Sequence, residues 1–350
     1  MPKLINILFF FGRIFAPLYS LAMIIRAWLY RTGIKSSRRL AIPVISVGNL
    51  TMGGTGKTPM VIYIVRLLAR HGRRPAIISR GYGGSSKEAV NIVANGRDVL
   101  MSAAAAGDEP VFLANILKVP VVTGRHRVLT GQYVQQNKLA DILVMDDGYQ
   151  HLALRRDLDI VLFSGRELLG NGQVFPGGPL REPCMALKRA HCFVITGVTS
   201  DNQPSVTSFC EKLRLWQPTI PIFQGGYMAA AIIDKSGVSH NLDSLRGVPL
   251  LAFCGIARPE SFFDLLGRNN DFNIKTRHRF ADHHPFTIRD LTKLQQEARA
   301  HDCKALLTTE KDMVKLSGYN ANLPVWALRV ELVMNQEFAD FICQKTGRQT

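Results

Sequence analysis

The sequence predicts an α/β protein: a doubly wound, mostly parallel sheet, a second, smaller α/β domain and an N-terminal interfacial helix. Between residues 41 and 197, short runs rich in Val, Ile and Leu alternate with stretches of helical apolar spacing. Such runs are typical of parallel strands that are buried on both faces. We expect strands at residues 44–47, 76–79, 119–123, 141–145, 159–163 and 192–196.

Composition narrows the classes of partner. Hydrophobic residues make up 47% of the 350 residues, and the mean hydropathy of +0.05 is high for a freely soluble enzyme, which indicates contact with lipid. The net charge of +16 is concentrated at the start, since 14 Lys and Arg precede the first acidic residue, Glu88. Such a segment indicates nucleic acid, an anionic membrane surface or a polyanionic substrate. Six scattered cysteines with no C-x-x-C pair indicate reduced cytosolic thiols.

The N-terminal segment favours the membrane surface among these partners. Residues 4–30 are almost wholly apolar, but the uncharged stretch after Arg13 has only 12 residues, and a bilayer needs about 20. A cluster of basic residues follows: Arg31, Lys35, Arg38 and Arg39. This pattern predicts an amphipathic helix within residues 1–35 that lies on an anionic membrane. A signal peptide is disfavoured because no small-x-small cleavage site follows, while a buried core helix remains an alternative.

A glycine-rich loop follows the first expected strand. Residues 51–59 read Thr-Met-Gly-Gly-Thr-Gly-Lys-Thr-Pro, and helical spacing begins at residue 60. In such loops backbone N–H groups face phosphates, the lysine reaches the terminal phosphates and the hydroxyl of the next residue binds Mg²⁺. The strict pattern is missed at Thr51, where a glycine is usual. We expect a nucleotide site formed by Thr51, Gly53, Gly54, Thr55, Gly56, Lys57 and Thr58.

Two pairs of carboxylates lie at the ends of expected elements. Asp146 and Asp147 follow a buried strand, where a carboxylate commonly joins the loop hydroxyl around Mg²⁺. Asp108 and Glu109 precede Pro110, which is also a good helix start without any function. A nucleotide site with a hydroxyl acceptor nevertheless needs a carboxylate to position or deprotonate that acceptor.

Other polar residues carry weaker signals. Asp282-His283-His284 reads as a surface loop on spacing alone, because a zinc site would need further ligands at set spacing. His151 and the arginines near residue 125 could bind phosphate. Polar and proline-containing residues at 199–204 and 217–221 indicate a joint, so we expect domains at residues 1–35, 36–215 and 216–350.

Taken together, the motifs closely resemble the tetraacyldisaccharide 4'-kinase (lipid A 4'-kinase) family over residues 1 to about 315. They are Val47-Gly-Asn-Leu-Thr51, Gly53-Gly-Thr-Gly-Lys-Thr-Pro59, Ser79-Arg-Gly-Tyr-Gly83, Gly107-Asp-Glu-Pro110, Asp146-Asp-Gly-Tyr-Gln-His151, Pro176-Gly-Gly-Pro-Leu-Arg-Glu182, Asp282-His283 and Thr309-Glu-Lys-Asp312, in this order. Tyr149 stands where many members have Phe, a conservative departure.

The resemblance implies an enzyme and assigns roles to these positions. It implies transfer of the ATP γ-phosphate to the 4' hydroxyl of a tetraacylated glucosamine disaccharide 1-phosphate, with Mg²⁺, by a protein peripheral to the cytoplasmic face of the bacterial inner membrane. We expect this protein to be a monomer. Lys57 and Thr58 would bind phosphate and Mg²⁺, and residues 36–215 would form the P-loop kinase domain. Asp108 would be the base, paired with His283 from a C-terminal domain that closes over the active site. Further positions would support the metal or substrate: Asp146, Asp147, Glu109, Tyr82, Arg125, His151 and Glu182.

A membrane-attached switch ATPase of the Min or ParA type is the alternative. Those proteins carry a lysine before the double glycine, where this chain has Met52. A nucleic-acid-binding protein would not need such apolar residues between its basic ones. The sequence therefore favours the kinase.

Overall fold

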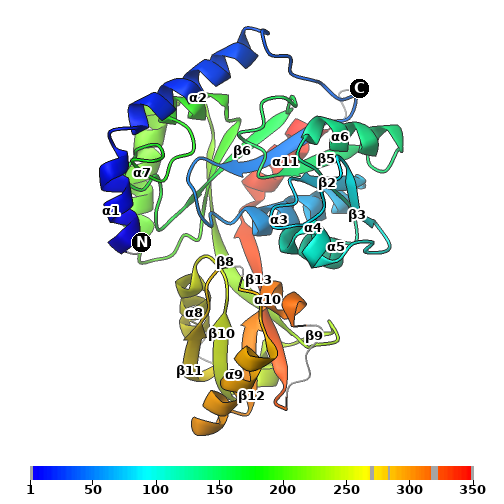
Figure 1. Ribbon diagram of the computed structural model, residues 1–350, viewed down its shortest axis with the longest axis vertical. Helices are drawn as coiled ribbons and strands as arrows, with labels where there is room; N and C mark the ends of the chain where they lie inside the picture. The colour runs from blue at the N-terminus through cyan, green and yellow to red at the C-terminus, as the bar shows by residue number, and fades with distance from the viewer. Residues whose placement is uncertain (1–2, 269–271, 283, 317–321, 348–350) are drawn as a thin grey trace. The chain divides into compact units, whose positions relative to one another are not determined.

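The computed structural model describes residues 3–268, 272–282, 284–316 and 322–347. The chain divides into two compact units. The first contains residues 1–226 and 334–350, and the second contains residues 227–333 (Figure 1). Each is an α/β unit, so the expected fold class is confirmed.

The sheet of the first unit is built from eight strands in the order β3-β4-β2-β5-β1-β6-β7-β8. Every residue of β1, β5 and β6 is buried, as strands covered by helices on both faces must be. All neighbours are parallel except β3 with β4. The bounds are β1 Val44–Asn49, β2 Pro75–Ser79, β3 Asn91–Asn95, β4 Pro120–Thr123, β5 Ile142–Asp146, β6 Leu158–Ser164, β7 Cys192–Thr196 and β8 Ile222–Ile233.

Six of these strands lie where the apolar runs predict them, whereas β8 was missed, and so was β3. It is an antiparallel edge strand whose sequence, Asn-Ile-Val-Ala-Asn, is short and ends in polar residues at both sides. The helices between the strands are α3 Lys57–Arg70, α4 Ala103–Ala106, α5 Asp108–Leu117, α6 Arg127–Gln136 and α7 Gln203–Trp216, with a 3-10 helix, η1, at Cys184–Arg189.

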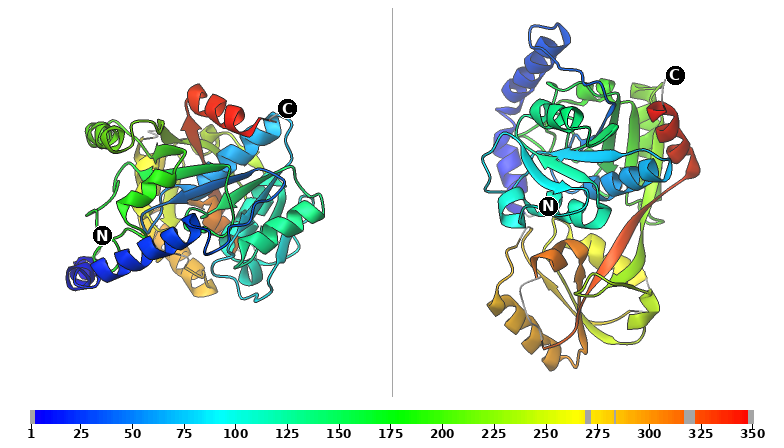
Figure 2. Two further views of the ribbon diagram at one scale, coloured as in Figure 1. Left: turned by 90° about the horizontal axis from the view of Figure 1, so that it is seen from above. Right: turned by 90° about the vertical axis from the view of Figure 1, so that its right-hand side faces the viewer.

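Two helices, α1 (Lys3–Gly12) and α2 (Ala16–Arg31), lie along the outside of the first unit (Figure 2). Ala16 is buried in a core cluster with Leu180 and Phe193, and Tyr19 packs on the same cluster. Gly12 approaches the Pro176 carbonyl so closely that an added Cβ would lie 2.2 Å from its oxygen. The opposite face carries large exposed side chains: Leu8, Phe10, Phe11, Ile14, Phe15, Leu18, Leu21, Ile24, Ile25 and Trp28. None of the described helices is long and apolar enough to cross a membrane.

The second unit has its own apolar core, and its strands continue the strand order of the same sheet through β8. Its strands are the remainder of β8, β9 Ser239–His240, β10 Pro249–Cys254, β11 Asn273–Arg279, β12 Ala305–Thr309 and β13 Val325–Met334, ordered β11-β10-β12-β13-β8 with β9 on β8. Its helices are η2 Leu242–Leu245, α8 Pro259–Arg268, α9 Ile288–Ala300 and α10 Glu310–Lys315. Leu250, Phe263 and Leu307 lie in one of its apolar clusters.

The boundary between the units differs from the expected one at residue 215. The residues expected to form a joint instead begin α7 and lead into β8, and the chain leaves the first unit within β8, after Gly226. It returns through β13 into α11 (Gln336–Thr346), which belongs to the first unit. The reason is apolar packing: the fully buried Phe338 of α11 contacts the rings of Tyr63 on α3 and Phe223 on β8.

Gly48 in β1 allows a test of how tightly the chain after β5 packs on β1. An added Cβ would lie 2.6 Å from Tyr149 Cβ and 2.8 Å from its backbone nitrogen. We therefore expect Gly48→Ala to lower the free energy of unfolding by about 1–3 kcal/mol, as overpacking does. Gly226→Ala is the matched control, because its nearest atom would be at an ordinary 3.5 Å. Thermal unfolding monitored by circular dichroism measures both, and equal midpoints would contradict the tight contact.

Candidate functional site

The glycine-rich loop joins β1 to α3 and is held on several sides. Gly53 and Gly56 adopt positive φ angles of 113° and 80°, which favour glycine. The side-chain amide of the fully buried Asn49 donates to the carbonyls of Thr51 (2.6 Å) and Gly53 (3.4 Å). The Thr196 hydroxyl donates to the Thr55 carbonyl (2.8 Å). These contacts hold the loop in place up to the N-terminus of α3. There, backbone N–H groups without a partner within the helix favour an anion.

Lys57 is the first residue of α3, and its ammonium group has two acceptors. Nζ lies 3.3 Å from Asn49 Oδ1 and 3.7 Å from Asp147 Oδ1. Asp147 also receives a bidentate pair from Arg181 Nη1, at 2.8 and 2.9 Å. Burial opposes ionisation of Asp147, but Lys57 and Arg181 outweigh it and hold the pKa of this carboxyl below its usual range. Asp147 is thus an anion between two cations.

Asp146, one residue earlier, differs from Asp147 because its surroundings disfavour the ionised form of its carboxyl. It is the last residue of β5 and is 5% exposed, and its Oδ1 has no hydrogen-bond partner. Burial, with Glu109 and Asp147 nearby, raises the pKa of Asp146 to about 7. A buried carboxylate that neighbours other carboxylates requires either a proton or a cation.

Thr58 and Glu109 complete this group of oxygens. The Thr58 hydroxyl donates to Glu109 Oε1 at 3.4 Å, joining the start of α3 to the start of α5. Among the described residues, no three acidic, His or Cys side chains converge tightly enough to hold a metal by themselves. A hard cation here would therefore need the Thr58 hydroxyl and phosphate oxygens besides Asp146 and Glu109. The unpaired Asp146 oxygen and the all-oxygen donor set fit Mg²⁺.

Asp108 is the first residue of α5, and a glycine loop packs against its backbone. Gly107 has a φ of 98°, and a Cβ on it would lie 2.5 Å from the carbonyl oxygen of Tyr82. Residues 81–84 form a turn in which Gly84 donates to the Gly81 carbonyl (3.3 Å). The Tyr82 ring is 79% exposed. The structure thus brings the Tyr82 backbone beside the start of α5.

Basic residues gather between β4 and the end of β5. Arg125 is exposed after β4, whereas Arg127 is buried, donates to the Arg125 carbonyl (3.1 Å) and leaves Nε without a partner. Burial and Arg80 lower the pKa of Arg127. Burial, Arg127 and Arg156 lower the pKa of His151 to about 4, so its imidazole is neutral at pH 7. Its buried Nε2 also has no partner.

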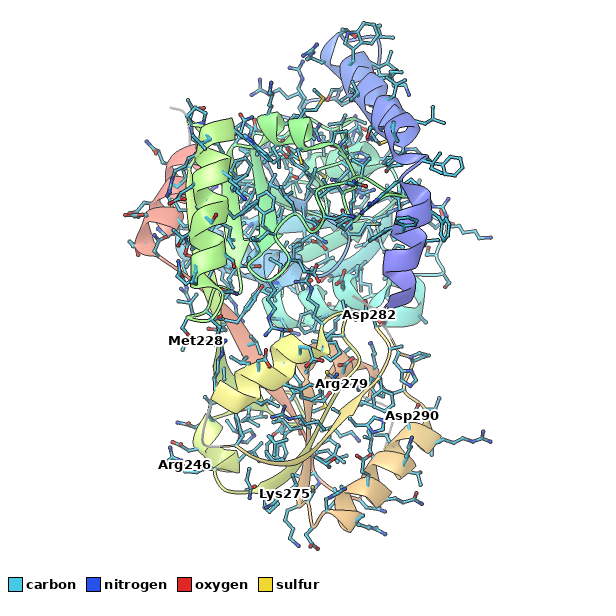
Figure 3. The ribbon with its side chains drawn as sticks, turned by 90° about the vertical axis from the view of Figure 1, so that its left-hand side faces the viewer. Met228, Arg246, Lys275, Arg279, Asp282 and Asp290 are labelled. Atoms are coloured by element: carbon cyan, nitrogen blue, oxygen red, sulfur yellow. The ribbon has the colours of Figure 1, made fainter. Side chains whose placement is uncertain are left out.

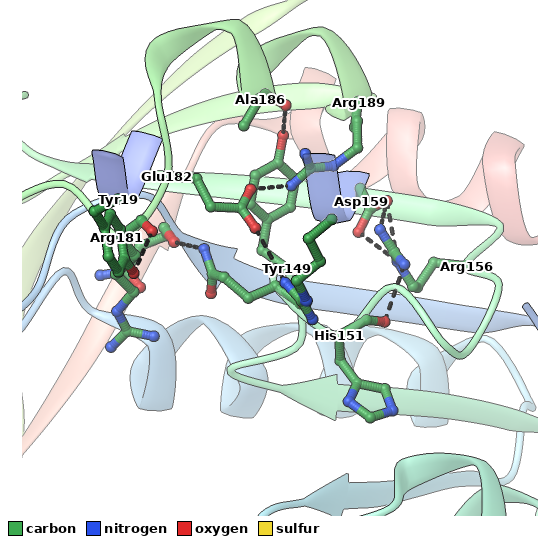
Figure 4. A network of polar contacts seen from close by, with 12 residues as sticks. Tyr19, Tyr149, His151, Arg156, Asp159, Arg181, Glu182, Ala186 and Arg189 are labelled. Atoms are coloured by element: carbon green, nitrogen blue, oxygen red, sulfur yellow. Dashed lines mark hydrogen bonds and ion pairs between the residues drawn. The ribbon is translucent and has the colours of Figure 1, made fainter. Parts of the chain in front are cut away.

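Glu182 lies in a second polar network, which reaches Arg26 on α2 (Figure 4). It is 3% exposed, accepts from Arg189 and lies 3.7 Å from Arg26 Nη1. The Tyr149 hydroxyl donates to the Ala186 carbonyl, and the Arg189 guanidinium lies 4.8 Å from the centre of the Tyr149 ring. The hydroxyl that distinguishes Tyr149 from Phe therefore has a buried acceptor, which explains why the departure is tolerated.

In the second unit, Asp282 follows β11, and α9, with Asp290 in its first turn, begins six residues later (Figure 3). His283 lies outside the described residues. His284 Nε2 is 3.0 Å from Asp290 Oδ2, and its ring stacks on Phe280. Asp312 of the Thr309–Asp312 motif is fully buried, where it accepts from Gly255 N–H (2.8 Å) and Lys315 (3.1 Å). This motif therefore stabilises the unit.

The first unit brings together the phosphate loop, Glu109, Asp146 and Asp147. Sequence reasoning gave no role to Asn49, Gln150 or Arg181, which contact the loop or the carboxylates. Arg127 belongs to the arginines that the sequence indicated as possible phosphate ligands. Asn49, Gln150 and Arg181 lie inside the quoted motifs, so the motifs carried a signal for them.

Comparison with known proteins shows one family. The family model described as tetraacyldisaccharide-1-P 4'-kinase matches residues 8–347. A tetraacyldisaccharide 4'-kinase of Desulfotalea psychrophila is 40% identical over 343 residues, which are 96% of either chain. That of Geobacter sulfurreducens is 43% identical over 319 residues, covering 91% of this chain and 87% of its own.

A solved structure is similar over almost the whole chain. It is the crystal structure of the "apo" form of LpxK from Aquifex aeolicus in complex with ATP, with a TM-score of 0.75 and 29% identity. The match covers 95% of this chain and 97% of that one.

The contrast between Asp146 and Asp147 gives a prediction on stability. Folded Asp146 keeps its proton up to about pH 7, whereas an ordinary carboxyl in the unfolded chain loses it near pH 4. Stability is therefore lost as the pH rises through this window and stays low above pH 7. Since Asn cannot ionise, we expect Asp146→Asn to raise the unfolding midpoint, by an amount that grows from pH 5 to pH 8.

Asp147→Asn is the control, because asparagine tolerates the φ of 50° at this position. The lowered pKa of Asp147 stabilises the folded state above the ordinary carboxyl pKa, so this variant should unfold at a lower temperature at pH 8. Thermal scans in chelator, without nucleotide, measure both changes. A lower midpoint for Asp146→Asn at pH 8 would contradict the conclusion that ionised Asp146 destabilises the folded state.

Proposed function

Because the chain belongs to the tetraacyldisaccharide-1-P 4'-kinase family, we propose that it transfers the ATP γ-phosphoryl group to the 4' hydroxyl of a tetraacylated glucosamine disaccharide 1-phosphate in lipid A biosynthesis. The observation that carries the proposal is the phosphate loop facing Glu109, Asp146 and Asp147. The family assignment does not favour the switch-ATPase alternative.

The loop and the carboxylates have distinct parts in this reaction. Backbone N–H groups of residues 51–58 bind the phosphates, and Lys57 neutralises charge on the transferring group. Asp147 and Asn49 hold the Lys57 ammonium at the start of α3 before ATP arrives. Thr58, Asp146 and Glu109 would hold Mg²⁺, which supplies charge neutralisation between the phosphates when bound. Asp147, which the sequence also suggested as a metal ligand, is paired with Lys57 and Arg181 and would instead position Lys57.

The acceptor hydroxyl requires a base, and we assign this part to Asp108 with His283. Asp108 lies at the N-terminus of α5, beside the Tyr82 backbone. A histidine would orient the carboxylate and share the charge of the proton. Tyr82, Arg125 and neutral His151 are the proposed support for the sugar and its phosphate. The buried Glu182 would support the site indirectly, through Arg26 and Arg189.

The exposed face of α1 and α2 supports contact with lipid. Ile14 is 79% exposed and Leu18 is 68% exposed, although both are apolar. Contiguous exposed apolar side chains followed by cations fit an anionic bilayer surface. This face supports the proposal that the protein is peripheral to the cytoplasmic face of the bacterial inner membrane. That it acts there as a monomer is a further part of the proposal.

The direct test is phosphorylation of the disaccharide lipid in mixed micelles by the full chain, with radiolabelled ATP. Wild-type protein should label the 4' position, and Lys57→Ala should lower turnover by about 10²–10³ or more, because it removes charge stabilisation from the transferring phosphate. ATPase activity without labelled lipid would instead support a switch protein. Near-normal turnover of folded Lys57→Ala would show that the loop is not the catalytic phosphate site.

A second test concerns lipid binding. We expect Ile14→Ser with Leu18→Ser to weaken co-sedimentation with phosphatidylglycerol vesicles by at least about tenfold, since each buried side chain contributes about 1.5–3 kcal/mol. Substitution is preferable to deletion, because Ala16 and Tyr19 pack on the core. Val238→Ser with Ile288→Ser, exposed in the second unit, is the control. Equal binding of both double variants would place the lipid contact elsewhere.

A third test concerns Asp108 and His283. Asp108→Ala should lower turnover sharply with little change in ATP affinity, and His283→Ala should cause a similar loss. If the two act as one unit, the double variant should be little worse than the poorer single variant. Single-turnover kinetics measure this, and multiplicative losses would leave His283 as a substrate-binding residue.

A further inference from the structure

A chain of hydrogen bonds runs from α2 to the phosphate loop. Arg26 Nη2 donates to the Gln150 carbonyl at 2.8 Å, and Gln150 Nε2 donates to the Asn49 carbonyl at 2.9 Å. The Asn49 side chain then accepts from Lys57 Nζ at 3.3 Å. Arg26 on α2 is thus linked to Lys57 by direct contacts through two residues, Gln150 in the β5–β6 connection and Asn49 at the end of β1.

Arg26 is held in this chain and does not behave as a free surface cation. Its Nη1 lies 3.7 Å from Glu182, which is 3% exposed and also accepts from Arg189. One guanidinium therefore links a buried carboxylate to the Gln150 carbonyl. Because both of its acceptors are fixed, the Arg26 guanidinium has a defined orientation, unlike the basic side chains that follow α2.

Asn49 is the residue of this hydrogen-bond chain that directly contacts the phosphate loop. Its backbone carbonyl is fixed by Gln150, while its side chain contacts the Thr51 and Gly53 carbonyls and Lys57. Because Asn49 is fully buried, a shift of its backbone must shift these contacts together.

A second route from α2 ends on the same ammonium group. The Tyr19 hydroxyl donates to the Arg181 carbonyl at 3.0 Å (Figure 4). The Arg181 side chain in turn pairs with Asp147. Asp147 Oδ1 lies 3.7 Å from Lys57 Nζ. Two routes that start about two helical turns apart on α2 thus converge on Lys57.

We propose that Arg26 and Gln150 are positioning residues for phosphate binding by Lys57 and act through Asn49. This inference rests on the proposed function, in which Lys57 binds the ATP phosphates. It assigns α2 a part in nucleotide binding that is separate from its apolar outer face. A purely structural Arg26 would anchor α2 and leave ATP affinity unchanged.

The test measures the ATP dissociation constant of the full chain by calorimetry, KM and kcat in mixed micelles, and vesicle binding. Gln150→Met keeps the length of the side chain and removes the donor to Asn49, and Arg26→Ala removes the first link. Each variant should weaken ATP binding and raise KM for ATP by about three- to tenfold, the effect of one lost hydrogen bond. Gln150→Met should bind vesicles as wild type does. The double variant should be no worse than the poorer single one, because both act through one route.

Matched controls make the same substitutions at exposed positions of the first unit: Gln136→Met and Arg155→Ala. Both should bind ATP as wild type does. Should Gln150→Met fail to fold, Gln150→Glu provides the same loss of the donor. Wild-type ATP affinity in the Arg26 and Gln150 variants, with Lys57→Ala defective, would overturn the inference. Wild-type affinity in Lys57→Ala would instead overturn the proposed function of the loop.

Discussion

The parallel pairing of β1 with β5 is the constraint on which the site depends. Val47 lies opposite Asp146 in this register, so the residues after both strands emerge at the same edge of the sheet. Gly48 permits Tyr149 to approach β1, because any side chain there would meet the Tyr149 backbone. A slip of one residue would turn Asp146 to the other face of the sheet. The pairing of β1 with β5 therefore sets the positions of both the phosphate loop and the carboxylates.

The charges at this edge are arranged so that one aspartate is satisfied and its neighbour is not. Asp147 has Lys57 and Arg181 as partners, whereas Asp146 is buried against Glu109 with an unpaired oxygen. A fold selected for stability alone would not retain such a carboxylate. Its unfavourable burial becomes useful where a cation binds, because the binding free energy is not offset by the loss of an existing partner.

Much of this could be predicted from the sequence, for identifiable reasons. The buried parallel strands are continuous apolar runs, and the loop around Lys57 has fixed spacing, so both leave a local signal. The edge strand β3 and the return of α11 leave none, because they depend on pairing with β4 and on the packing of Phe338 against Tyr63. The parts played by Asn49 and Gln150 also escaped prediction, since their contacts join residues up to 101 positions apart.

The return of the chain through β13 into α11 has a consequence for synthesis at the ribosome. The second unit is inserted within the first, so α11 is translated after the whole of residues 227–333. Until then, Tyr63 on the helix of the phosphate loop lacks the Phe338 ring that packs against it. The nascent first unit therefore exposes apolar surface, together with the apolar side chains of α1 and α2, while the insert is being made. Chaperones or the membrane surface itself would meet this incomplete core before the last helix arrives to close it.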